Sequence, residues 1–350
     1  MFRIFQPKKI PVSVVTGFLG SGKTTLVNRL VSHKHFKDTA LIINEFGDIG
    51  IDHLLVREVD EQMVMLTKGC VCCTVRADIV TTLKELFQKR AAGAIPKFKR
   101  VLIETTGIAD PAPVVYALTH SPIAKRFLYL DTVVTAIDPV HVMNTLEHHE
   151  ECLRQIAVAD VLMLTKRDLV SNTDALSIKD QIHRLNPNAI WQESENGDAS
   201  PSHFFGNSLF VGKKAKPDLD QWLSSKKHDH SHSSKHKSIE TFTILREKPL
   251  SMQTFQAFHS TLLNFKDANI LRIKGVLNIE SAEGPLLIHG VQHVLSPLQW
   301  LKRWPSKDQR TRIVFITKGV SKDSIECMLS GFERTANVEM HHKIRPRHQT

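Results

Sequence analysis

The sequence predicts an α/β protein, in which a doubly wound and mainly parallel sheet is followed by a small α+β domain. From residue 12 to about residue 223, short apolar runs alternate with longer amphipathic runs, as strands and helices do in a parallel sheet. A polar stretch without any apolar side chain then covers residues 224–238. Alternating and amphipathic runs return in residues 239–340, which indicates a second core.

Each predicted element is an apolar run bounded by polar or turn-forming residues. In the first domain, residues 1–223, we expect strands at residues 12–15, 40–44, 101–104, 132–137, 161–164 and 189–191, and helices at residues 23–32, 77–89, 112–118, 150–157 and 175–185. In the second domain, residues 239–340, we expect strands at 241–245, 270–277, 285–289 and 313–316, and helices at 254–263 and 324–332. We expect a flexible His-rich linker at 224–238 and a basic tail at 341–350.

Composition limits the function classes. An apolar fraction of 41% over 350 residues is enough for packed cores, which excludes a disordered or fibrous chain. The first residues lack the apolar stretch of a signal peptide, and no later segment is apolar for long enough to cross a bilayer. We therefore expect a cytoplasmic protein without a membrane partner. The net charge is +10, but lysines and arginines are scattered outside the linker and the tail, so we expect no nucleic-acid partner.

A phosphate-binding motif follows the first predicted strand. Residues 17–24 match the pattern G-x-x-x-x-G-K-[ST] between a strand and a helix. Glycines let backbone amides wrap around phosphate oxygens, and the start of the helix adds positive potential. We expect Lys23 to contact the β and γ phosphates, Thr24 to hold Mg²⁺ and Thr25 to approach the α phosphate. The predicted nucleotide ligands of this segment are Gly17, Gly20, Ser21, Gly22, Lys23, Thr24 and Thr25.

A second segment fits the same site. Glu104 ends the predicted strand 101–104, and Gly107 follows three residues later. The carboxylate can reach the Mg²⁺ shell, and the glycine can offer its N–H to the γ phosphate. A carboxylate at a strand end is also commonly just a solvated terminus, so this segment is weak evidence alone.

A third segment selects the base. Thr165, Lys166 and Asp168 follow the predicted strand 161–164 and match the [NT]KxD element with which GTPases recognise guanine. Asp168 would accept two hydrogen bonds from the guanine ring, and Lys166 would lie over it. Adenine would leave these polar groups unpaired, so the motif favours GTP over ATP.

Three cysteines, Cys70, Cys72 and Cys73, lie within four residues. In a reducing compartment such a cluster indicates metal or redox chemistry, and thiolates are soft ligands for Zn²⁺ or Cu⁺. Three adjacent thiolates cannot easily complete a tetrahedron, so another side chain, water or a client's ligand would take the fourth position. An open coordination sphere suits metal delivery. A redox switch and a chance cluster beside a turn are the alternatives.

Other candidate ligands have equally simple explanations. Glu45 and Asp48 follow the predicted strand 40–44, where other GTPases place a switch that senses the γ phosphate. Either carboxylate could join the metal, orient the attacking water or only form an exposed acidic turn. Cys152 and Cys327 stand alone, and we expect both to be small buried side chains. The linker histidines, which could capture metal or only keep a spacer in water, are His228, His230, His232 and His236.

These segments, in this order and spacing, resemble one family. GFLGSGKTT, NEFGDIGID, GCVCC, ETTGIADP and TKRD are similar to the motifs of the CobW-type metallochaperone GTPases, in the zinc chaperone subgroup with a CxCC motif. That family also has a His-rich linker and a small CobW C-terminal domain. The resemblance implies a P-loop GTPase that binds zinc at Cys70, Cys72 and Cys73, hydrolyses GTP and transfers the metal to a client metalloprotein. Chaperones for cobalt or nickel are similar and stay as alternatives.

Two departures from the family matter. Thr165 stands where asparagine begins the base motif, and we expect the chain to lose a brace to the P-loop there. We also find no N-terminal client-docking extension, so the resemblance identifies no client.

The expected reaction is in-line attack of water on the γ phosphate of GTP. Lys23, the P-loop amides and Mg²⁺, held by Thr24 and Glu104, would stabilise the transferred group. Because no arginine finger is identifiable, we expect slow turnover that metal, homodimerisation or the client accelerates. Two alternative functions stay open. One is a P-loop kinase, and the other is a non-catalytic, nucleotide-dependent metal or redox sensor.

Overall fold

The computed structural model describes residues 9–33, 36, 38–44, 64–67, 75–194, 197–206, 239–264, 269–304 and 306–344. The chain forms two compact units, Met1–Pro217 and Asp218–Thr350. We call them the N-terminal and C-terminal units and describe each by itself. Among the described residues, no helix has the length and apolar character needed to cross a membrane.

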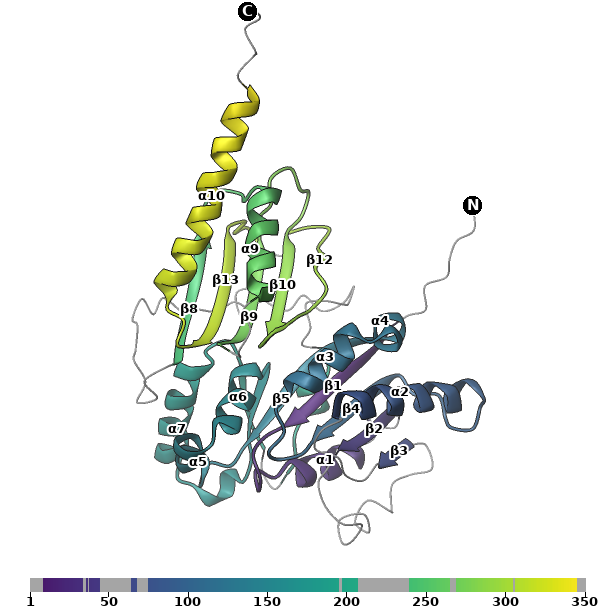
Figure 1. The fold of residues 1–350 in the computed structure, drawn as a ribbon. Helices are drawn as coiled ribbons and strands as arrows, with labels where there is room; N and C mark the ends of the chain where they lie inside the picture. Colours follow the sequence, from purple (N-terminus) through teal and green to yellow (C-terminus); the bar gives the residue numbers. More distant parts are fainter. Residues whose placement is uncertain are drawn as a thin grey trace, which may run out of the picture. The chain divides into compact units, whose positions relative to one another are not determined.

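The N-terminal unit is built on a seven-stranded sheet with the order β3-β2-β4-β1-β5-β6-β7, and every neighbouring pair is parallel (Figure 1). The strands are β1 Ile10–Thr16, β2 Thr39–Asn44, β3 Val64–Thr67, β4 Arg100–Thr105, β5 Leu128–Ile137, β6 Val161–Leu164 and β7 Ile190–Glu193. The central strand is β1, in which Val14 pairs with Ile103 of β4 and Val133 of β5. The predicted doubly wound parallel fold is confirmed.

Helices cover both faces of this sheet. They are α1 Lys23–Val31, α2 Val75–Ala91, α3 Ala112–His120, α4 Pro122–Phe127, α5 Val142–His148, α6 Glu150–Val158 and α7 Asn172–Leu185, with short 3₁₀ turns at Arg167–Leu169 and Pro201–His203. The chain moves across the sheet in one direction from β1 to β2 and in the other from β3 to β7. Because such crossovers are right-handed, α1 covers one face, while α2, α3 and α6 lie over the other (Figure 1).

Apolar side chains of the first helix anchor it to the sheet. Leu26 and Leu30 of α1 are fully buried in one cluster with Val15 of β1 and Leu102 of β4. Burying an aliphatic side chain of this size contributes about 1.5–3 kcal/mol. The helix that follows the Gly-rich loop is therefore fixed to the central strands, and so is the loop.

The C-terminal unit is an antiparallel sheet with two helices on one face. Its strands are β8 Ile239–Arg246, β9 Ile270–Leu277, β10 Leu286–Val291, β11 Val294–Leu295, β12 Gln299–Trp300 and β13 Thr311–Lys318, and its helices are α9 Met252–Asn264 and α10 Lys322–Ile344. Figure 1 shows the two helices side by side over the strands. Phe258 of α9 and Leu329 of α10 share one core with Ile273 and Phe315 of the sheet. The predicted α+β domain is confirmed.

The structure adds elements that the sequence pattern does not reveal, namely β3, α4, α5, β11 and β12. These contain two to seven residues each, too few for a period to be recognised. The last helix, expected at residues 324–332, extends to Ile344 and past the expected start of the tail. No proline lies between Lys322, the first residue of α10, and Pro346, and helices usually end at or before the residue that precedes a proline.

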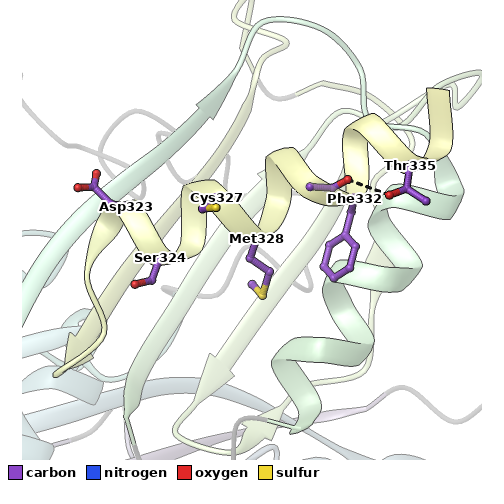
Figure 2. Close-up of a pocket in the computed structure, with 7 residues that line it drawn as sticks. Asp323, Ser324, Cys327, Met328, Phe332 and Thr335 are labelled. Carbon is purple, nitrogen blue, oxygen red and sulfur yellow. Dashed lines mark hydrogen bonds between the residues drawn. The ribbon is translucent and has the colours of Figure 1, made fainter. Parts of the chain in front are cut away.

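The two isolated cysteines have different surroundings. Cys152 of α6 is buried, as expected, and burial raises the pKa of its thiol to about 12. The expectation for Cys327 is wrong, because this residue is exposed. It lies on α10, in a shallow groove lined also by Ser324, Met328 and Phe332 (Figure 2). A helix of this length presents one face to solvent, and the sequence pattern does not distinguish the two faces at a cysteine.

Candidate functional site

The segments predicted to bind nucleotide gather at one edge of the parallel sheet. Strands β4, β1, β5 and β6 are neighbours in that order, and all four point the same way. A segment predicted to bind nucleotide lies at the carboxyl end of β4, β1 and β6, and the polar residue Asp138 follows β5. Ligands of doubly wound sheets bind at this edge.

The loop between β1 and α1 has the backbone of a phosphate cradle. Gly22 has a φ of 82° and caps α1 without any side-chain hydrogen bond, so the first amides of the helix face an open end. Gly17 has a φ of 142°, and a Cβ atom there would lie 2.4 Å from the carbonyl oxygen of Ala136. Only glycine fits this close approach to β5. The loop therefore suits a polyanion held by backbone amides.

Two polar side chains of this loop are buried. Lys23 is 6% exposed, and its ammonium donates a hydrogen bond to the carbonyl oxygen of Phe18 at 3.1 Å. Ser21 is 2% exposed, and its hydroxyl oxygen has no hydrogen-bond partner among the described residues. A buried cation and a buried hydroxyl inside one glycine-lined loop fit phosphate oxygens.

Thr24 and Glu104 form the next contact of the site. The Thr24 hydroxyl donates to Oε1 of Glu104 at 2.8 Å, which brings the first turn of α1 to the end of β4. Glu104 is 1% exposed. Hydroxyl and carboxylate oxygens are ligands that Mg²⁺ prefers, so this pair fits the ion. Among the residues that the structure describes, no three His, Cys, Asp or Glu side chains gather closely enough to hold a metal ion.

Residues 106–110, here called the 106–110 loop, follow β4 and lie against the P-loop. A Cβ atom on Gly107 would meet the Leu19 side chain at 2.6 Å and the Leu19 backbone nitrogen at 2.8 Å. On its other side the loop is held by Gln155 of α6, whose Nε2 donates to the carbonyl oxygens of Gly107 and Ala109, each at 3.1 Å. Glycine at position 107 thus lets two segments that are predicted to bind phosphate approach each other closely.

Thr165 connects the base motif to the P-loop. Its hydroxyl oxygen lies 2.7 Å from the carbonyl oxygen of Ser21 and 2.9 Å from that of Ile137, so its single proton reaches either acceptor. The expectation that threonine at this position loses the brace to the P-loop is wrong. The end of β6 is close enough to the loop for a shorter side chain to span the distance.

Lys166 and Asp168 follow at the same strand end. Lys166 has a left-handed backbone with a φ of 47°, and its ammonium lies 2.7 Å from Oδ2 of Asp138. Asp168 is exposed on the 3₁₀ turn Arg167–Leu169. Its carboxylate is therefore accessible to a base, while Lys166 is held at the end of β5.

Asp138 was not among the predicted site residues. It is 8% exposed, and it accepts hydrogen bonds from Lys166, from the Val140 amide at 2.9 Å and from His141 at 3.1 Å. Burial alone would raise the pKa of this carboxyl, but the hydrogen bonds and the Lys166 charge outweigh it and lower the pKa. The signal in the sequence was a polar residue directly after the predicted strand 132–137.

The remaining predicted residues are not brought into these contacts. Thr25 is exposed in the first turn of α1. Gly20, with a φ of 73°, has open space where a Cβ would lie. Several predicted ligands lie outside the described residues. They are Glu45, Asp48, the clustered cysteines Cys70, Cys72 and Cys73, and the linker histidines His228, His230, His232 and His236.

The fold and the site define a P-loop nucleotide-binding protein. Residues 11–192 match the model of the CobW/HypB/UreG nucleotide-binding domain, and residues 239–333 match that of the cobalamin synthesis protein CobW C-terminal domain. The first match alone covers more than half of the chain. The chain belongs to the CobW/HypB/UreG family.

The relatives described here align with 93% of the chain. The zinc chaperone YjiA of Escherichia coli K12 is 28% identical over 326 residues, which cover 93% of this chain and 99% of YjiA. The zinc-regulated GTPase metalloprotein activator 1 of Dictyostelium discoideum is 26% identical over 396 residues, covering 93% of this chain and 81% of the relative. The crystal structure of zinc-bound YjiA GTPase from E. coli has a TM-score of 0.73 and 24% identity, covering 93% of this chain and 99% of that one. The resemblance expected from the motifs is confirmed.

Proposed function

We propose that this chain is a GTP-hydrolysing metallochaperone that binds zinc at Cys70, Cys72 and Cys73 and transfers it to a client metalloprotein. It is a P-loop GTPase of the CobW/HypB/UreG family, and relatives that align over 93% of this chain carry the names zinc chaperone and zinc-regulated GTPase metalloprotein activator. The observation that carries the enzymatic part is the contact of Thr24 with Glu104 beside the buried Lys23.

Different site residues contact the phosphates and the Mg²⁺ ion during phosphoryl transfer. Lys23 and the P-loop amides neutralise the β and γ phosphates, and Gly107 supplies an N–H to the γ phosphate. Thr24 and Glu104 would hold Mg²⁺, which supplies positive charge next to the transferred group when bound. Attack by water then releases inorganic phosphate and leaves GDP.

The base motif makes the site specific for guanine. Asp168 accepts from N1–H and from the N2 amino group of guanine, and Lys166, anchored by Asp138, lies over the base. Thr165 fixes this motif to the P-loop at Ser21. Adenine would leave the Asp168 carboxylate without its donors, which costs about 1–3 kcal/mol.

The strands that precede the proposed metal ligands end at the same sheet edge as β4. Strands β4, β2 and β3 are parallel neighbours, so Glu104, Asn44 and Thr67 end on one side of the sheet. Glu45 directly follows β2, and Cys70 comes three residues after β3. This closeness along the chain to two neighbouring strand ends supports the proposal that the metal site is coupled to a segment that senses the γ phosphate, with Glu45 as the proposed fourth ligand.

The other proposed features follow from this role. Residues 1–223 form the GTPase domain, 224–238 the His-rich linker and 239–340 the CobW-like domain, and the basic tail of residues 341–350 begins within the last turn of α10. The protein acts in the cytoplasm, where thiolates stay reduced and able to exchange metal. A homodimer, the metal or the client accelerates hydrolysis, and neither nucleic acid nor membrane takes part.

One metal titration tests the coupling. Zinc affinity is measured by competition with a chromophoric chelator, in the presence of GDP or of a nonhydrolysable GTP analogue. We expect different affinities in the two states, and no tight site in the variant with Cys70, Cys72 and Cys73 changed to serine. Equal affinity in both states would remove the thermodynamic basis of the switch.

A hydrolysis assay tests the enzyme class. The wild type is expected to release free phosphate from GTP without any acceptor molecule, and Lys23→Ala is expected to abolish this release while the melting temperature is kept. A kinase would release little phosphate until its acceptor is added. A non-catalytic sensor would bind the nucleotide and leave it intact.

A further inference from the structure

One buried side chain outside the predicted site holds the 106–110 loop. Gln155 of α6 is fully buried, and its amide nitrogen lies 3.1 Å from the carbonyl oxygens of both Gly107 and Ala109. A side-chain amide has two N–H groups, so each carbonyl receives its own hydrogen bond. This is a two-point clamp on the loop that carries Gly107.

Gln155 is itself fixed from two sides. Its backbone carbonyl accepts from the Thr135 hydroxyl of β5 at 2.7 Å. The end of α6 is held by Asn186, whose amide donates to the carbonyl oxygens of Ile156, Ala157 and Ala159 at 2.8–3.2 Å. The clamp therefore belongs to the rigid sheet-and-helix frame, and the loop is the part that is positioned.

A second contact joins the same helix to the same loop. The Arg154 guanidinium lies 3.4 Å from Oδ2 of Asp110, and the other carboxylate oxygen accepts from the Ala112 amide at 2.9 Å. Arg154 is 31% exposed, so this ion pair is weaker than the buried amide clamp. Before the first residue of α6, the ring of His149 lies 4.6 Å from the ring of Phe18 in the P-loop.

We propose that Gln155 is a positioning residue for the γ phosphate, with Arg154 as a second and weaker tie. The clamp sets the distance between the 106–110 loop and the P-loop, where Gly107 already touches Leu19. The inference rests on the proposed function, in which Gly107 offers its N–H to the γ phosphate. GDP has no γ phosphate, so its binding does not depend on the loop.

The test compares the affinities for two nucleotides in one variant. Gln155→Met keeps the length of the side chain and removes both donors, so the carbonyl oxygens of Gly107 and Ala109 lose the hydrogen bonds that hold the loop. A displaced Gly107 would lose about one hydrogen bond to the γ phosphate, which corresponds to about tenfold in affinity. We expect the variant to bind a nonhydrolysable GTP analogue about tenfold more weakly and GDP with unchanged affinity, measured by displacement of a fluorescent nucleotide. The control is Gln181→Met, the same change on the exposed surface of α7, which should alter neither affinity.

Failure of the positioning role of Gln155 can be distinguished from failure of the proposed function. An unchanged ratio of the two affinities, or an equal loss for both nucleotides, would overturn the positioning role and leave a merely structural one. If Gln155→Met does not fold, Arg154→Ala serves, because it removes only a partly exposed side chain. Arg154→Ala should lower the affinity for the GTP analogue, relative to that for GDP, by about twofold. An unchanged relative affinity would overturn the inference. A wild type that binds neither nucleotide would overturn the proposed function instead.

Discussion

The hydroxyl oxygen of Thr165 lies 2.7 Å from the carbonyl oxygen of Ser21, and this contact ties the base motif to the P-loop. Both segments are proposed to contact GTP and GDP alike, so Thr165→Val should weaken the binding of both nucleotides equally, by about fivefold, as expected for one lost hydrogen bond. Fluorescent-nucleotide titration measures both affinities. Thr165→Ser keeps the hydroxyl and should bind like the wild type. Unchanged affinities in Thr165→Val would show that the contact does not contribute.

Glu104 is expected to act through its charge. Glu104→Gln keeps the size of the side chain and an oxygen that can accept from Thr24, but a neutral amide is a poorer Mg²⁺ ligand. The Mg²⁺ concentration that supports half-maximal GTP hydrolysis should rise about tenfold or more. Glu280→Gln, the same change at an exposed position of the C-terminal unit, is the matched control. An identical Mg²⁺ dependence in Glu104→Gln would argue against this ligand.

Asp138 should stabilise the N-terminal unit in a pH-dependent way. Its pKa in the folded protein is lowered from 3.8, so the stabilisation is fully present above that value and is lost as the pH falls through the lowered pKa. Asp138→Asn should lower the melting temperature by about 2–4 °C between pH 5 and pH 7, and the difference should shrink below about pH 4. Circular dichroism at several pH values measures this.

The control for Asp138 is Asp198→Asn, which makes the same change on the exposed surface. It should leave the melting temperature unchanged across the same pH range. A difference between Asp138→Asn and the wild type that persists undiminished in acid would mean that the carboxylate charge is not its source.

The two isolated cysteines should react very differently with an alkylating reagent. The test uses the variant in which Cys70, Cys72 and Cys73 are serine. Iodoacetamide at pH 8 should label the exposed Cys327 and spare Cys152, because Cys152 is buried and its thiol has a pKa of about 12. Mass spectrometry of peptides reads the result, and both residues should react after denaturation. Rapid labelling of Cys152 in the folded protein would contradict its buried position.

The strands of the parallel sheet were predictable because they are buried on both faces and form continuous apolar runs. Five strands, β1, β2, β4, β5 and β6, show this pattern, while β7 is only partly buried. β3 has four residues, Val64–Thr67, in a stretch without a recognisable period. The length of α10 was underestimated, because its second half, after residue 332, shows no apolar periodicity from which a helix could be inferred.

The site was predictable where a backbone motif implies its own geometry, and much less so elsewhere. The Gly-rich loop and the TKRD segment can be recognised because their predicted site residues lie next to each other in the sequence. Gln155 and Asp138 act through residues that are distant in the sequence, so only the fold brings them to the loop and to Lys166. A polar residue on the apolar face of α6 was the only available signal for Gln155.

Gly107 also limits how this protein can be redesigned. A side chain at this position would enter the space of the Leu19 backbone, 2.8 Å away, and a backbone cannot step aside as a flexible side chain can. Ile108, its neighbour, is 48% exposed and has no such restriction. In a library that randomises both positions and is selected for GTP hydrolysis, the surviving clones should be diverse at position 108 and uniform at position 107.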